Sequence, residues 1–215
     1  MRSLVIGGNS RNVGKTGLAV SIINATRDLQ WTAVKVTQFG HGVCSRTGGP
    51  CGCAVTTPSC PYEISVEDGR IASTDTARML AAGAVEVLWV RVALGQLALA
   101  MPAVRERLAG KGCVLFESNS IMEHWRPDAY LSVLQCDLDD CKASAARVAS
   151  SADAFVLPPF QRRNPGWTGF DRSLLNQTPL FNVSPPSFCS PDIVEFVRGR
   201  MQGQSPTDRR VGAAS

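Results

Sequence analysis

The sequence predicts an α/β protein of three layers, with a mainly parallel sheet and helices on both faces. Three observations lead to this fold class. Short apolar runs alternate with helix-like segments along the chain, as expected where crossover helices cover a parallel sheet. The 215 residues are enough for one good-sized core. The apolar share of 44% and the charged share of 19% are ordinary for a globular domain.

The elements follow one another in a regular order. A buried strand at residues 3–8 precedes a helix at 14–28, in which Leu18, Ile22 and Ile23 share one face. Further strands are expected at 31–37, 85–92, 112–118, 129–134, 153–159 and 179–186. Further helices are expected at 75–84, 94–109, 142–151 and 191–201. A ligand of such a sheet is expected at the carboxyl ends of the strands.

The chain is predicted to form one domain over residues 1–202, with two irregular features after the second strand. Residues 40–61 break all periodicity and form a Cys-rich insert. Residues 62–73 are expected to form a hairpin, because Asp68-Gly69 is a strong turn dipeptide between two alternating runs. The tail 203–215 has no apolar pattern and is predicted to be disordered.

Composition argues against several classes of partner. The net charge is only +4, and the basic residues are scattered, so binding to nucleic acid is not expected. No apolar run reaches the roughly 18 residues of a membrane span, so no membrane association is expected. The start, MRSLVIGG, lacks the longer apolar stretch of a signal peptide. We therefore expect a cytoplasmic protein.

Residues 8–17, GNSRNVGKTG, predict a phosphate-binding loop between the first strand and the first helix. Gly14-Lys15-Thr16 fits the common motif, although Asn9 stands where that motif has its first glycine. Backbone N–H groups would face phosphate, Lys15 would reach the outer phosphates, and Thr16 would hold Mg²⁺. The alternative is a purely structural glycine-rich turn. The residues expected at the nucleotide are Gly8, Asn9, Ser10, Arg11, Asn12, Val13, Gly14, Lys15, Thr16 and Gly17.

The spacing of this loop resembles the variant loop of dethiobiotin synthetase. That enzyme belongs to a class of P-loop NTPases that also includes signal-recognition GTPases and MinD-like ATPases. The segment DTARMLAAGA at 75–84 is similar to the Asp-Ser-x-Arg…Ala-Gly-Ala segment of the molybdopterin-guanine dinucleotide biosynthesis protein B family, the closest resemblance. The resemblance to this family covers roughly residues 1–160 and implies a P-loop NTPase fold.

The resemblance implies roles for four residues outside the loop. Glu117, at the end of a strand, would be an acid near Mg²⁺ or else a solvent-facing side chain, and Asp75 would approach the metal or cap its helix. Lys35 would contact the substrate, as a lysine does in dethiobiotin synthetase, or reach solvent from the strand. Asn182 would read the nucleotide base or belong to a turn. Adenine and guanine remain equally open, because no Asn-Lys-x-Asp motif is present.

The Cys-rich insert predicts a metal site. Eight cysteines are many for a chain expected in a reducing compartment. Thiolates with an imidazole suit Zn²⁺ or an Fe–S cluster, although the spacing is not that of a zinc ribbon. Reduced free thiols or a redox-active pair are the alternatives. The expected ligands are Cys44, Cys51, Cys53, Cys60 and His41.

Together these features predict an Mg²⁺-dependent protein that binds ATP or GTP and acts in cofactor or metal-centre biosynthesis. Lys15, Thr16 and Glu117 are its expected catalytic residues. The resemblance implies assistance to a partner enzyme, and since dimers are common in this class, a homodimer is among the expected assemblies. Two alternatives remain: a nucleotide-switched metal-delivery or redox protein that uses the Cys insert, and a ligase or kinase of the dethiobiotin synthetase type.

Overall fold

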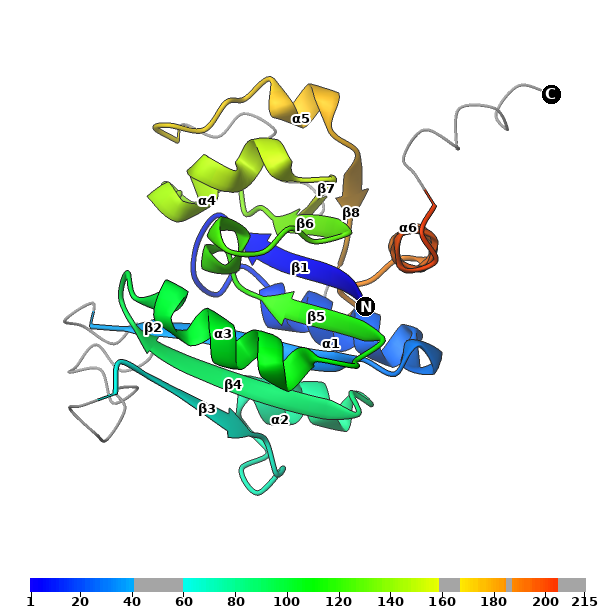
Figure 1. The fold of residues 1–215 in the computed structure, drawn as a ribbon. Coiled ribbons are helices and arrows are strands. Elements are labelled where there is room, and N and C mark those ends of the chain that lie inside the picture. The colour runs from blue at the N-terminus through cyan, green and yellow to red at the C-terminus, as the bar shows by residue number, and fades with distance from the viewer. Residues whose placement is uncertain (41–59, 159–166, 185–186, 205–215) are drawn as a thin grey trace.

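The protein is built on one mostly parallel β-sheet (Figure 1). The structure is a computed structural model, and it describes residues 1–40, 60–158, 167–184 and 187–204. The strand order is β3-β4-β2-β5-β1-β6-β7-β8, and only β3 runs antiparallel to its neighbour. The strands are β1 (Arg2–Gly8), β2 (Thr32–Phe39), β3 (Tyr62–Val66), β4 (Glu86–Ala93), β5 (Cys113–Glu117), β6 (Ala129–Val133), β7 (Ala154–Leu157) and β8 (Leu180–Asn182).

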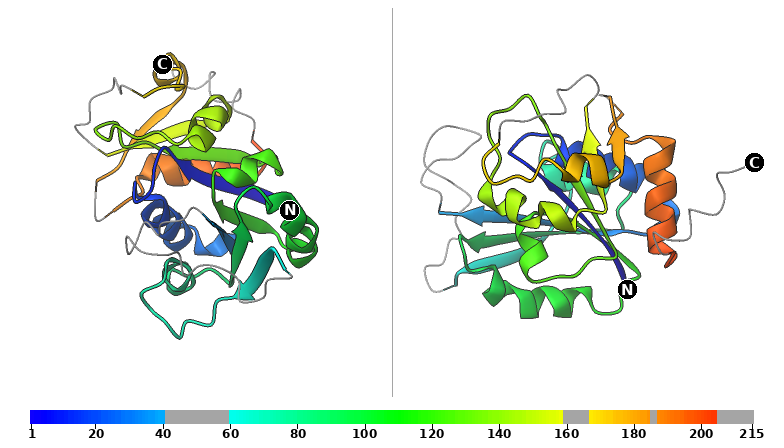
Figure 2. Two further views of the ribbon diagram at one scale, coloured as in Figure 1. Left: turned by 90° about the vertical axis from the view of Figure 1, so that its left-hand side faces the viewer. Right: turned by 90° about the horizontal axis from the view of Figure 1, so that it is seen from above.

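Helices cover both faces of this sheet, as the two views of Figure 2 show. The α-helices are α1 (Lys15–Ala25), α2 (Asp75–Ala81), α3 (Leu97–Leu108), α4 (Ala143–Val148), α5 (Leu174–Gln177) and α6 (Pro191–Met201). Short 3₁₀ segments are η1 (Arg27–Leu29), η2 (Ser120–Glu123) and η3 (Ala149–Ser151). Residues of α1, α2 and α6 share one buried cluster with β1, and residues of α3 share another with β4.

The alternation of side chains along each strand creates these two cores. In β1, Leu4 and Ile6 belong to the cluster under α1, whereas Val5 belongs to the cluster under α3. A strand buried on both faces needs apolar residues at consecutive positions, and the run from residue 4 to 6 supplies them. The predicted α/β class with a mainly parallel sheet is therefore confirmed, including helices on both faces.

The predicted hairpin at 62–73 is wrong. β3 pairs with β4, a strand about twenty residues later in the chain, in the register Ile64 opposite Val90. The chain bends at Gly69, which has φ 76°, but it then enters α2 instead of a second strand. The Glu67 carboxylate accepts hydrogen bonds from Gly69 N and Thr76 Oγ1. This carboxylate therefore ties the turn to the start of α2.

Thr74, and not Asp75, caps α2. The Thr74 side chain accepts a hydrogen bond from Ala77 N at 3.0 Å, which is the usual bond of an N-cap residue. Asp75 is the first residue of the helix and turns its carboxylate to a lysine of the sheet. The capping alternative for Asp75 is thus excluded by this geometry.

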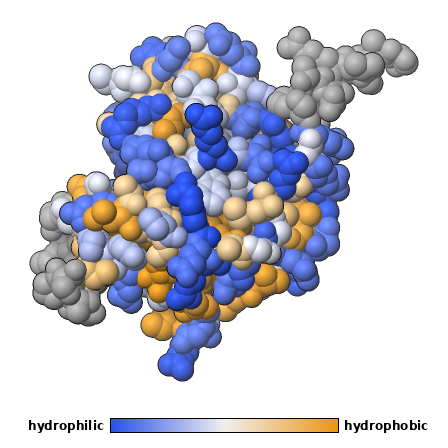
Figure 3. Space-filling model, in the orientation of Figure 1, coloured by the Kyte–Doolittle hydropathy of each residue, from blue (hydrophilic) through white to orange (hydrophobic). Residues whose placement is uncertain are grey.

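The surface is mixed in character, with polar and apolar residues interspersed on the face drawn in Figure 3. The exposed large apolar side chains include Leu94 and Leu99, next to and within α3. Within the described ranges, no helix is both long enough and apolar enough to cross a membrane.

Candidate functional site

The predicted phosphate loop lies between β1 and α1. β1 ends at Gly8, residues 9–14 form the loop, and α1 begins at Lys15. Gly14 has φ 98° and Asn12 has φ 58°, both in the left-handed region, where a residue without a Cβ is favoured. No side chain caps α1, so its first N–H groups are available to an external acceptor.

Gly7, near the end of β1, allows the segment that follows β5 to approach the backbone closely. The Asn119 side chain accepts from Gly8 N and donates to Gly8 O, each at 2.8 Å. A Cβ on Gly7 would lie 2.2 Å from Asn119 Oδ1, so no larger residue fits there. The segment after β5 thereby fixes the start of the loop.

The middle of the loop is anchored to the segment that follows β6. Asn9 is fully buried, and its side chain accepts from Gln135 N at 2.9 Å and donates to Asp140 O at 3.0 Å. The Ser10 hydroxyl donates to the Asp140 carboxylate at 2.5 Å. Asn9 O accepts from Lys142 N at 2.8 Å. Asn9, at the position of the missing glycine, therefore has a structural role that glycine could not fill.

Lys15 folds back over the loop and donates from Nζ to Ser10 O at 2.6 Å. Burial lowers the pKa of Lys15 to about 8, and the charges of Lys142 and Lys35 act in the same direction, whereas Glu117 opposes them. The pKa of Lys142 is also lowered, first by burial and then by the charge of Arg11. Lys142 and Lys35 thus lie close enough to Lys15 to disfavour its charged form, as Arg11 does for Lys142, and an anion beside them would offset this repulsion.

Thr16 connects the loop to a buried carboxylate. Its hydroxyl lies 2.9 and 3.0 Å from the two carboxylate oxygens of Glu117. Glu117 ends β5 and is 6% exposed. Its Oε1 also accepts from Lys35 Nζ at 3.0 Å, and Lys35 Nζ donates to Asp75 Oδ2 at 2.7 Å. A continuous polar chain therefore runs from Thr16 through Glu117 and Lys35 to Asp75.

Strand register brings these residues together. Glu117 of β5 lies opposite Ile6 of β1 on one side and Lys35 of β2 on the other. Ile6 belongs to the core under α1, so Glu117 and Lys35 point to the same face as the start of that helix. Burial alone would lower the pKa of Lys35, but the Glu117 charge and the Asp75 hydrogen bond outweigh it and raise the pKa. Lys35 is accordingly held as an ammonium ion.

The oxygen atoms of this chain suit a hard divalent cation. Mg²⁺ prefers carboxylate, hydroxyl and water oxygens, and Thr16, Glu117 and Asp75 offer one hydroxyl and two carboxylates. In the part of the chain that the structure describes, no group of three or more His, Cys, Asp or Glu side chains is placed to hold a metal. The oxygen atoms of Thr16, Glu117 and Asp75 are thus of the kinds that Mg²⁺ prefers, and they are fewer than its octahedral geometry requires.

Asn182, the residue predicted to contact the nucleotide base, is not connected to this cluster. Asn182 ends β8 and is exposed, and the hydrogen bonds of the described residues do not connect it to the loop. β8 lies at one edge of the sheet, separated from β1 by β6 and β7. Its role at a base stays a prediction.

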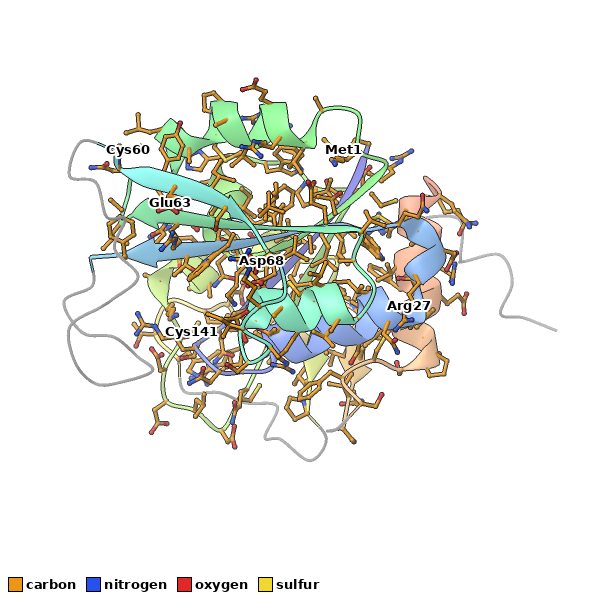
Figure 4. The ribbon with its side chains drawn as sticks, turned by 90° about the horizontal axis from the view of Figure 1, so that it is seen from below. Met1, Arg27, Cys60, Glu63, Asp68 and Cys141 are labelled. Atoms are coloured by element: carbon orange, nitrogen blue, oxygen red, sulfur yellow. The ribbon has the colours of Figure 1, made fainter. Side chains whose placement is uncertain are left out.

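The Cys-rich insert lies mostly outside the described residues. His41, Cys44, Cys51 and Cys53 are not described, and Cys60 is exposed, with its thiol donating to Tyr62 O at 2.9 Å. Cys60 lies toward the end of the molecule at which β2 ends (Figure 4). The proposed metal of this segment therefore stays a prediction, which metal analysis of protein purified without oxygen tests.

Three residues of the site were missed by sequence reasoning. Asn119, Asp140 and Lys142 contact the loop from positions more than one hundred residues later in the chain. For Asn119 a signal existed, because it follows a strand-end acid by two residues. Asp140 and Lys142 follow no motif, and only the pairing of β1 with β6 brings their segment to the loop.

Comparison with known proteins does not assign the chain to a family. No protein-family model matches the chain, and no curated protein is similar enough to be matched.

Proposed function

We propose that the protein is an Mg²⁺-dependent P-loop NTPase that binds ATP or GTP through residues 8–17. One observation carries the proposal: Thr16, in the first turn of α1, is hydrogen-bonded to the strand-end carboxylate of Glu117. A hydroxyl and a carboxylate so placed beside an uncapped helix N-terminus match the requirements of a metal–triphosphate. The proposal includes a Zn²⁺ ion or an Fe–S cluster bound by the Cys-rich insert that follows β2 in the sequence.

In this proposal, different residues contact different parts of the triphosphate. The N–H groups at the start of α1 donate to phosphate oxygens, and Lys15 exchanges its bond with Ser10 O for a bond to an outer phosphate. Thr16 and Glu117, with Asp75, would hold Mg²⁺, which would neutralise charge on the phosphates. Lys15 then stabilises the negative charge that develops as the outer phosphate is transferred.

The proposed biological role is assistance in cofactor or metal-centre biosynthesis, together with a partner enzyme. This role rests on the resemblance of residues 75–84 to the molybdopterin-guanine dinucleotide biosynthesis protein B family. Asp75 of that segment supports the link, because it reaches the cluster through Lys35.

A second candidate is a ligase or kinase of the dethiobiotin synthetase type, and the position of Lys35 favours it. Lys35 is a largely buried ammonium group beside the proposed metal ligands, with 18% of its side chain exposed. The carboxylate of a small-acid substrate, placed next to the outer phosphate, would meet this charge. In that case Lys35 would orient the acceptor for phosphoryl transfer.

Phosphate release from ATP and from GTP, measured with and without Mg²⁺, tests the first proposal. We expect Mg²⁺-dependent release by the wild type and a loss of about 100-fold or more in Lys15→Ala, because removing a charge that stabilises the transition state costs this much. Arg107→Ala, on the far helix α3, is the matched control for loss of a cation. Activity that is unchanged in Lys15→Ala would contradict the proposal.

A further inference from the structure

Phe188 packs against both glycines that flank Lys15-Thr16. A Cβ on Gly14 would lie 2.9 Å from Phe188 Cε1, and a Cβ on Gly17 would lie 2.7 Å from Phe188 Cδ2. Real Cβ atoms do not approach other atoms this closely. The ring therefore lies directly over the first turn of α1, and a side chain on either glycine would displace it. Gly17 has no positive φ, so the ring itself is the reason that this position requires glycine.

An open cavity lies beside the two chain neighbours of Phe188, although Phe188 itself is not among its lining residues. It has a volume of about 520 Å³ and begins one helical turn beyond Gly17, at Ser21. Ser187 and Cys189, the chain neighbours of Phe188, line it from the other side, together with the start of α6. Its volume lies within the range of small-molecule sites. The lining offers hydroxyl groups from Ser21 and Ser187 and the amide of Asn24.

We infer that Phe188 and this cavity form the subsite for the nucleoside half of the bound nucleotide. The inference rests on the proposed function. A phosphate chain bound by the N–H groups of the first turn of α1 leaves its sugar and base beside that turn, where the Phe188 ring lies. An aromatic ring suits a base, and the serine hydroxyls and Asn24 suit a ribose.

Two further observations bear on this assignment. Phe188 is only partly buried, so the residue is accessible to a ligand. Neither Asn182, the residue expected at the base, nor Phe188 lines the cavity, but Ser187 and Cys189, on either side of Phe188, do. The subsite thus assigns the base to the segment after β8 and not to the end of that strand.

Equilibrium titration with two ligands tests the inference: the preferred nucleoside triphosphate and inorganic tripolyphosphate, which has no nucleoside. The variants are Phe188→Leu, which keeps an apolar side chain, and Phe188→Ala. We expect each to weaken nucleotide binding about tenfold, the usual effect of losing one base–aromatic stacking contact. Tripolyphosphate binding is expected to stay within about twofold of wild type, because its contacts are with the loop.

Several results would overturn the inference. An equal loss for both ligands would mean that Phe188 only supports the loop, and no loss for either would place the nucleoside elsewhere. A selective loss in Asn182→Ala with none in Phe188→Leu would assign the base to Asn182. These results leave the proposed function standing. If the wild type binds neither nucleotide nor tripolyphosphate, the proposed function fails, and the subsite fails with it.

Discussion

Replacing Lys35 by methionine removes the ammonium group that separates two carboxylates in the site. Among the described residues, Glu117 is then left with the Thr16 hydroxyl as the hydrogen-bond partner of a side chain that is 5% exposed. Removing one member of a buried ion pair costs about 3–5 kcal/mol. Because Asp75 is 37% exposed and can turn to solvent, we expect the lower end, about 3 kcal/mol. In a chain of this size that lowers Tm by roughly 6–12 °C.

The second part of this prediction concerns Mg²⁺. If Glu117 and Asp75 are metal ligands, Mg²⁺ replaces the missing charge in Lys35→Met, whereas in the wild type it must compete with Lys35. Thermal unfolding in EDTA and in excess MgCl₂ therefore should show a larger Mg²⁺ stabilisation in the variant than in the wild type. A ligand at free concentration c that binds only the native state stabilises it by RT ln(1 + c/Kd), so tighter Mg²⁺ binding gives a larger stabilisation.

Lys111→Met provides the matched control. Lys111 pairs with Glu86 at 2.9 Å, but their side chains are 34% and 29% exposed. Such a surface pair contributes at most about 1 kcal/mol, and we expect no dependence on Mg²⁺. The reasoning is refuted if Lys35→Met costs no more than this control, or if Mg²⁺ stabilises the wild type and Lys35→Met equally.

Three further predictions concern the loop and its surroundings. Burial lowers the pKa of Lys15 from 10.5 to about 8, so between these pH values the unfolded chain binds more protons than the native protein, and the free energy of unfolding rises with pH by up to about 1.4 kcal/mol per pH unit. Urea unfolding should show this rise in the wild type and not in Lys15→Met. Parallel pH dependences of the two proteins would contradict the prediction. Asn119→Ala leaves the N–H and C=O of Gly8 without the Asn119 side chain as their partner and should lower the free energy of unfolding in urea by about 2 kcal/mol. A change below about 0.5 kcal/mol would contradict the structural role of these two hydrogen bonds. Burial raises the pKa of Cys136 and of Cys189 to about 11, so at pH 8 each thiol should be alkylated roughly 100-fold more slowly in the native protein than in urea. Peptide mass spectrometry measures both rates, and equal rates would show that these thiols are not shielded.

The sequence was sufficient for the fold class and for the residues that follow local rules. The apolar runs give the strands because a buried parallel sheet needs continuous apolar segments, and α6 has the predicted bounds, 191–201. The Ser190 side chain caps this helix, and Pro191 starts it, which are strong local signals. The loop at 8–17 and the strand-end acid Glu117 also follow from local pattern.

What the sequence did not reveal depends on strand order. Lys35 and Glu117 become neighbours because β5 inserts between β2 and β1, and no local pattern encodes that insertion. The same holds for Asn119 and Phe188, which reach the loop from distant parts of the chain. The hairpin at 62–73 failed for a related reason: pairing with β4 buries the apolar face of β3, including Ile64, against the core under α3.

Calorimetric titration of the wild type with ATP and with GTP, in MgCl₂ and in EDTA, tests the central claim most directly. The account predicts that at least one nucleotide binds, that EDTA weakens binding, and that Glu117→Gln removes most of this Mg²⁺ dependence while leaving Lys15-dependent binding in EDTA. Absence of binding by both nucleotides at millimolar concentration with Mg²⁺ would contradict it.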